Sequence, residues 1–126
     1  MLRGWLREDE QAVVDLEVIC RDGSKRTVSA VIDTGFNGQL SFSRHLLDEI
    51  DFSVTQIGTI EMELASGDLI EEDVYSGMIR FDGKELPTEI ILTDAGDTFI
   101  GTGLLTGKVL IINFATRDVT IQDHGS

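Results

Sequence analysis

Apolar and polar residues alternate along this chain in short runs, and turn-forming residues separate the runs. The apolar segment Ala12–Cys20 carries two acids, Asp15 and Glu17, spaced two residues apart, which predicts a half-buried strand. Asp22-Gly23, a pair typical of tight hairpins, follows, and Arg26–Ile32 returns as the partner strand. The first part of the chain is therefore predicted to be a β-hairpin that ends at Ile32.

A longer alternating segment, Gly58–Phe81, is interrupted in its middle by small and polar residues. This pattern predicts a long hairpin with its tip at Ser66-Gly67. Asp82-Gly83 marks another hairpin, and Thr98–Phe114 is the last strongly apolar stretch. The second half of the chain is thus also expected to consist of strands.

One segment, Phe42–Ile50, has the pattern of a helix. Leu46, Leu47 and Ile50 share one face, and Ser43 can cap the first turn. We expect the last four residues, 123–126, to fray. Together these patterns predict an all-β fold with one short helix.

Composition narrows the class of protein. With 126 residues the chain is expected to form one domain over residues 1–126. Its 23 acids against 10 basic residues give a net charge of −13, which repels nucleic acids and anionic membranes. Its one cysteine cannot form an internal disulfide, and no segment is apolar and long enough for a signal peptide or a membrane span. We expect a cytoplasmic protein that binds neither nucleic acid nor membrane.

Asp33-Thr34-Gly35 directly follows the apolar strand that ends at Ile32. A buried strand that ends in an acid is costly unless something satisfies or uses the charge. In an ordinary turn, the Asp33 side chain would accept hydrogen bonds from nearby amides and Gly35 would adopt a left-handed conformation. Alternatively, two such carboxylates could share one proton, one acting as a base on water while the other polarises a carbonyl. Since the tripeptide occurs once, such a pair requires a two-fold symmetric homodimer.

Four segments, in the same order and spacing, resemble the retropepsin-like aspartic peptidases. "AVIDTGFNGQLSF" is similar to their active-site strand and loop, and "FIGTGLL" (Phe99–Leu105) to their second signature. "LASGDLIEEDVY" stands where the family has its flap hairpin, and "KVLIINFATRDVTI" is similar to the closing strands. The likeness extends from about Gly4 to Ile121 and is greatest to small bacterial single-domain members with an Asp-Thr-Gly-Phe-Asn-Gly motif.

The resemblance implies an acid-protease barrel and an aspartic endopeptidase that works as a homodimer on peptide or protein substrates, without a cofactor or metal. It implies that Asp33 is the catalytic carboxylate, that Thr34 bonds across the dimer axis, and that Gly35 allows close approach. The flap tip that binds substrate would be Ala65, Ser66, Gly67 and Asp68. The walls of the side-chain pockets would include Val31, Phe36, Ile100 and Leu104.

This chain departs from the family pattern at two positions. Phe36 replaces the small residue that most members have after the motif, which is expected to reshape a pocket. Gly103 stands where Asp or Asn is common, which is expected to remove a polar brace.

Two alternatives to this function stay open at the level of sequence. The fold could serve as a non-catalytic module that binds peptides or assembles proteins. A single chain could also pair Asp33 with a second acid, for which Asp94 and Asp97 are the candidates. Neither of these acids has the Thr-Gly context that follows Asp33.

Overall fold

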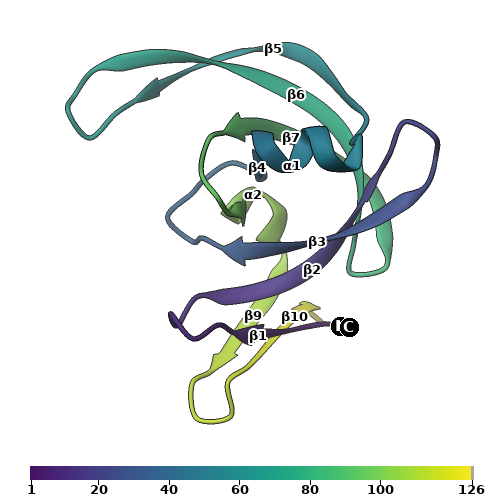
Figure 1. The fold of residues 1–126 in the computed structure, drawn as a ribbon. Coiled ribbons are helices and arrows are strands. Elements are labelled where there is room, and N and C mark those ends of the chain that lie inside the picture. Colours follow the sequence, from purple (N-terminus) through teal and green to yellow (C-terminus); the bar gives the residue numbers. More distant parts are fainter. Residues whose placement is uncertain (126) are drawn as a thin grey trace.

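The structure, a computed structural model, describes residues 1–125; Ser126, the end of the predicted tail, lies outside the described residues. Strands dominate it (Figure 1). In chain order the elements are β1 (Leu2–Leu6), β2 (Ala12–Ile19), β3 (Lys25–Ile32), β4 (Leu40–Ser43), α1 (Arg44–Ile50), β5 (Val54–Glu63), β6 (Leu69–Phe81), β7 (Lys84–Thr93), β8 (Thr98–Ile100), α2 (Thr102–Leu105), β9 (Lys108–Asn113) and β10 (Asp118–Asp123).

The strands β6, β7, β4, β8, β3 and β2 form a ring, which closes because β2 also pairs with β6. Two pairings in the ring, β3–β8 and β4–β7, are parallel, and the others are antiparallel. Beyond β2 the sheet continues through β1 and β10 to β9, in the lower part of Figure 1. The predicted all-β barrel is confirmed.

Alternation along the strands fills the barrel with apolar side chains. On β2, Val14, Leu16 and Val18 are buried and face inward, whereas the acids between them are not buried. The rings of Phe42 and Phe52, both fully buried, lie with their centroids 5.1 Å apart. Burial of such side chains, at about 25 cal/mol per Å² of apolar surface, is the main force that holds the sheet closed.

The helix predicted around Phe42–Ile50 is present as α1, and Ile50 is its buried residue. Ser43 occupies the N-cap position, but its side chain makes no capping hydrogen bond. A second helix, the single turn α2, was not predicted, because a few apolar residues in a row do not distinguish a strand from a helical turn.

The predicted hairpin turns are present. Gly23 and Gly67 have φ values of 84° and 89°, in the left-handed region where glycine has no steric penalty. The prediction of a frayed tail is wrong for Asp123, which ends β10 and accepts a hydrogen bond of 2.8 Å from Lys108. The ion pair between Lys108 on β9 and Asp123 on β10 joins residues that are not neighbours in the chain, so a local sequence pattern does not reveal it.

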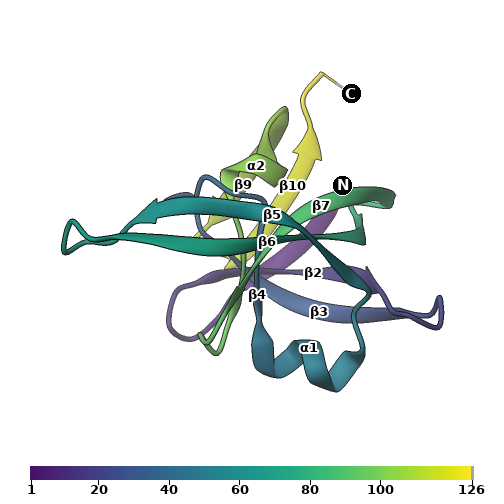
Figure 2. The same ribbon diagram turned by 90° about the horizontal axis from the view of Figure 1, so that it is seen from above.

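The hairpin of β5 and β6 extends beyond the barrel, of which the second half of β6 is a part. Seen from above, it projects as an arm well beyond the other strands (Figure 2). Its strands pair from Val54 with Gly77 to Glu63 with Leu69. No helix within residues 1–125 is long and apolar enough to cross a membrane.

Candidate active site

Asp33 is held at the carboxyl end of β3. Its amide donates to the carbonyl oxygen of Ile100 at 2.9 Å, which extends the parallel pairing of β3 with β8 by one residue. Its Oδ1 accepts a hydrogen bond of 2.9 Å from the amide of Gly35. The carboxylate is half-buried, so it is fixed in direction and still open to a reactant.

The loop after Asp33 is fastened to the second signature by backbone hydrogen bonds. The amides of Gly101, Thr102 and Gly103 donate to the carbonyl oxygens of Gln39, Phe36 and Gly38 at 3.0, 2.8 and 3.0 Å. Backbone bonds and the Thr102 hydroxyl, 3.4 Å from the Phe36 oxygen, therefore brace this loop although Gly103 has no polar side chain.

Glycine is required where the two segments meet. A Cβ on Gly101 would overlap the Gly38 carbonyl oxygen and the Phe36 ring. A Cβ on Gly103 would come within 2.9 Å of the same oxygen. The two stretches singled out in the sequence, around Asp33 and around Gly101, thus form one close-packed unit.

Thr34 and Gly35 are exposed at the surface of this loop. Within residues 1–125, no hydrogen bond is found that uses the Thr34 hydroxyl. The loop therefore presents a free hydroxyl beside the Asp33 carboxylate, on a surface that another molecule can reach.

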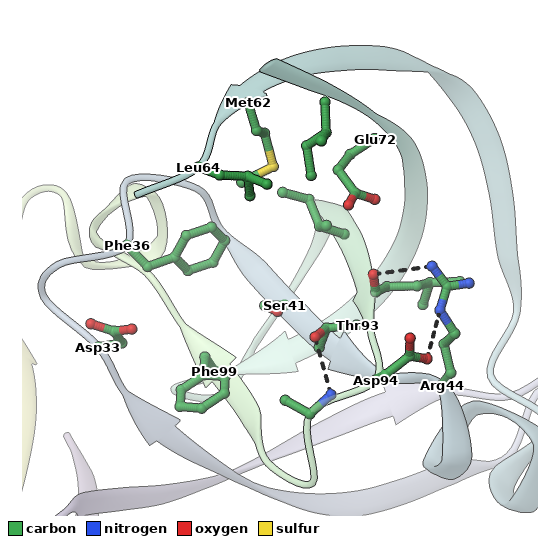
Figure 3. A pocket seen from close by; sticks show the side chains of 14 residues that line it. Asp33, Phe36, Ser41, Arg44, Met62, Leu64, Glu72, Thr93, Asp94 and Phe99 are labelled. Carbon is green, nitrogen blue, oxygen red and sulfur yellow. Dashed lines mark hydrogen bonds and ion pairs between the residues drawn. The ribbon is translucent and has the colours of Figure 1, made fainter. Parts of the chain in front are cut away.

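A cavity of about 460 Å³ opens between Asp33 and the β5–β6 hairpin (Figure 3). This volume lies within the range of about 300–1,000 Å³ that is usual for ligand pockets. Asp33 and Phe36 lie on one side of the view, below Met62 and Leu64 of the hairpin. The lining consists of Asp33, Phe36, Ser41, Arg44, Met62, Leu64, Ile70, Glu72, Ile91, Leu92, Thr93, Asp94, Ala95 and Phe99.

Of the four residues expected in a pocket wall, Phe36 lines this cavity. Val31, Ile100 and Leu104 are buried, with exposed fractions of 3%, 0% and 5%, and do not line it. The period of two explains the difference on β8, because Ile100 packs into the core while Phe99 faces the cavity.

The end of the cavity away from Asp33 is charged, and sequence reasoning did not find it. Arg44, at the start of α1, has its Nε 3.3 Å from Asp94 Oδ1. Glu72 reaches the same region from β6 (Figure 3). The sequence did contain one indication that Glu72 lies in the cavity. Side chains alternate between the two faces of β6, so Glu72 lies on the same face as Ile70.

The two candidates for a second acid in the same chain each have a cation as partner. Asp97 does not line the cavity, and its carboxylate accepts hydrogen bonds of 2.8 and 3.2 Å from Arg7. The same contact raises the pKa of the Arg7 guanidinium further above its usual range. Asp94 pairs with Arg44, and in Figure 3 it lies on the other side of Phe99 from Asp33.

The tip of the β5–β6 hairpin is a tight turn. The Leu64 amide donates to the Asp68 carbonyl at 2.8 Å, and the Gly67 amide donates to the Leu64 carbonyl at 2.9 Å. The Ser66 hydroxyl donates to Asp68 Oδ2 at 3.0 Å. The predicted tip is confirmed as a turn, and Ala65, Ser66, Gly67 and Asp68 are all exposed. Within residues 1–125, no three His, Cys, Asp or Glu side chains gather in a way that could hold a metal ion.

No protein-family model and no curated protein matches the sequence of this chain. Solved structures do match its fold. A retropepsin-like aspartic protease from Rickettsia conorii aligns with a TM-score of 0.59 at 11% identity, over 97% of this chain and 89% of that one. The EIAV protease, solved with the inhibitor HBY-793, aligns with a TM-score of 0.55 at 13% identity, over 79% of this chain and 89% of that one.

The simian foamy virus (mac) protease aligns with a TM-score of 0.50 at 15% identity, over 73% of this chain and 91% of that one. At such identities the likeness concerns the fold, and each alignment covers most of the matched protease chain. The resemblance of the four sequence segments predicted this fold, and in it Asp33 follows the end of β3, beside the cavity. The chain has the retropepsin-like fold of the aspartic proteases.

Proposed function

We propose that this protein is an aspartic endopeptidase whose catalytic pair is formed by Asp33 from each of two identical chains. The observation that carries the proposal is the position of Asp33, half-exposed at the mouth of a largely apolar cavity beneath a long hairpin. The retropepsin-like fold supports it, because the matching structures are aspartic proteases.

We infer the homodimer from the chemistry of the pair. A single carboxylate cannot serve as base and acid at once, and Asp94 and Asp97 each have a cation beside them. A two-fold axis at the exposed loop would bring the two copies of Asp33 together, with Thr34 bonding across the axis and Gly35 leaving room for the approach.

In the reaction, two neighbouring carboxylates share one proton. The ionised one takes a proton from water, whose oxygen attacks the peptide carbonyl carbon, while the protonated one donates a hydrogen bond to the carbonyl oxygen. The tetrahedral intermediate then collapses, its C–N bond breaks, and the nitrogen receives a proton from the pair. The products are a carboxylic acid and an amine, and no covalent enzyme intermediate forms.

The hairpin would hold the substrate against this pair. Its exposed tip, Ala65–Asp68, would bond the peptide backbone and exclude water, while Met62 and Leu64 of the hairpin and Phe36 of the floor contact side chains. An extended peptide fits such a site as an added strand.

The test compares wild type with Asp33→Asn on a mixed peptide library across pH 4 to 8, with the oligomeric state measured on the same samples. Each copy carries a charge of −13, so high protein concentration and moderate salt are needed to favour association. We expect a wild-type dimer that cleaves peptides, and a loss of about 10³-fold or more in kcat/KM for Asp33→Asn.

Four results would contradict the proposal. Full activity of Asp33→Asn, or of a strictly monomeric protein, would exclude a shared pair. If Asp94→Asn or Asp97→Asn lost peptidase activity as completely as Asp33→Asn, the catalytic pair would lie within one chain. A stable dimer that binds peptides and cuts none would leave the non-catalytic binding module as the function.

A further inference from the structure

The cavity beside Asp33 has an apolar middle and a charged far end. Side chains from the hairpin and from β7 and β8 form the middle, including Met62, Ile70 and Phe99. Arg44, Glu72 and Asp94 form the charged end, on the side of Figure 3 opposite Asp33. A long side chain that enters at Asp33 therefore crosses apolar surface before it meets charge.

The charges at that end do not balance. Arg44 is already compensated, because its Nε lies 3.3 Å from Asp94 and its Nη2 is 3.5 Å from the carbonyl oxygen of Leu92. Glu72 is half-buried on β6, and within residues 1–125 no hydrogen bond or ion pair to its carboxylate is found. One negative charge, that of Glu72, is thus left over at the charged end of the cavity.

We propose that Glu72 determines substrate specificity, by selecting peptides with a Lys or Arg side chain at one position near the cleaved bond. This inference rests on the proposed function, since it assumes that the cavity holds the substrate. The aliphatic stem of the basic residue would lie along Met62 and Ile70, and its cation would meet the Glu72 carboxylate.

An acidic substrate side chain fits the same cavity poorly. It would compete with Asp94 for Arg44 and would lie beside Glu72 at the same time, so repulsion would offset the attraction. A purely apolar side chain would fill the middle but leave Glu72 without a partner.

The experiment starts from one peptide that the wild type cleaves. Six positions of this peptide are varied, three on each side of the cleaved bond. Each variant peptide carries Lys, norleucine or Glu at one of these positions. The values of kcat/KM are compared at fixed ionic strength for wild type, Glu72→Gln, Glu72→Lys and the control Glu71→Gln. Glu71 is the matched control because it is the next residue on β6 and points to the opposite, exposed face.

At one position we expect the wild type to prefer Lys over norleucine by about tenfold, the size of a charge-assisted hydrogen bond. Glu72→Gln should remove most of this preference, Glu72→Lys should favour Glu instead, and Glu71→Gln should keep the wild-type pattern. A preference that is absent in wild type, or that survives in Glu72→Gln, would overturn the inference.

If the wild type cleaves nothing, the proposed function fails, but the cavity can still be tested. Binding of fluorescein-labelled Lys, norleucine and Glu peptides to wild type and Glu72→Gln is then measured by anisotropy. Tighter binding of the Lys peptide that is lost in Glu72→Gln supports the role of Glu72, and equal binding of the three peptides contradicts it.

Discussion

Among the carboxylates that line the cavity, only Asp94 has a cation beside it within residues 1–125. Asp33 is instead oriented by the Gly35 amide, at 2.9 Å, and Glu72 projects from a strand face shared with Ile70. A carboxylate that no cation neutralises can act on a bound molecule. At the residue scale, these two acids are therefore the ones to which we assign chemistry.

Phe42 supports this site from behind. It is fully buried in β4, next to Ser41, which lines the cavity and pairs with Phe99. Replacing Phe42 by Ala removes most of its contact with Phe52, and we expect the free energy of unfolding to fall by about 3–5 kcal/mol. Urea denaturation measures this, and Phe114→Ala is the control. Phe114 is 62% exposed, so its replacement should change stability by less than about 0.5 kcal/mol.

At the scale of elements, the site depends on how β3 and β8 lie side by side. Their parallel pairing aligns Ile32 with Ile100, and the following residues, Asp33 and Gly101, start the braced loop. Parallel neighbours cannot be joined by a tight hairpin, so the chain forms β4 to β7 between them. This is why residues more than 60 positions apart in the chain make one site.

Gly101→Ala tests this junction. The new Cβ would overlap the Gly38 carbonyl oxygen, so the loop must shift, and we expect a loss of about 1–3 kcal/mol in stability. Peptidase activity should fall further than the unfolded fraction explains, because the Asp33 loop moves. Gly96→Ala is the matched control, since no heavy atom lies within 4 Å of a Cβ there. Equal behaviour of the two variants would show that the close contact is unimportant.

At the scale of the whole molecule, ion pairs connect parts of the chain that the barrel does not. Arg7 bonds Asp9 and also Asp97, which precedes β8, and Lys84 and Lys108 both bond Asp123. The hydrogen bond from Arg7 lowers the pKa of Asp9, and that from Lys108 lowers the pKa of Asp123, each from the ordinary value of 3.8. Each of these pairs is lost when its carboxyl takes up a proton.

We therefore expect stability to fall as the pH is lowered through and below about 4. A carboxyl whose pKa is lower in the folded state stabilises the fold above its unfolded pKa, and this contribution is lost as the folded carboxyl takes up a proton. Urea midpoints between pH 6 and 2.5 measure the effect, and Asp123→Asn should give a shallower dependence. Midpoints that rise toward low pH would contradict the assignment. Peptidase assays near pH 4 should accordingly include a folding control.

Much of the fold could be predicted because its signals are local. Alternation in Ala12–Ile19 and turn residues such as Gly23 and Gly67 act over two to four positions, and these elements appear where expected. The single turn α2 was missed because Thr102–Leu105 is too short to show a period. Phe99 faces the cavity, whereas the resemblance implied Ile100; a three-residue strand is too short for alternation to indicate which of its faces is inside.

The sequence by itself determined the β2–β3 and β5–β6 hairpins, their tips and Asp33 at the end of an apolar strand, since each depends on neighbours in the chain. Only the tertiary structure decided which distant groups meet. Closure of β2 on β6 and the parallel pairs bring Arg44, Glu72 and Asp94 to one cavity, and they give Asp97 a partner 90 residues away. Hydrophobic burial and sheet pairing select these contacts across the whole chain, and no short segment contains that information.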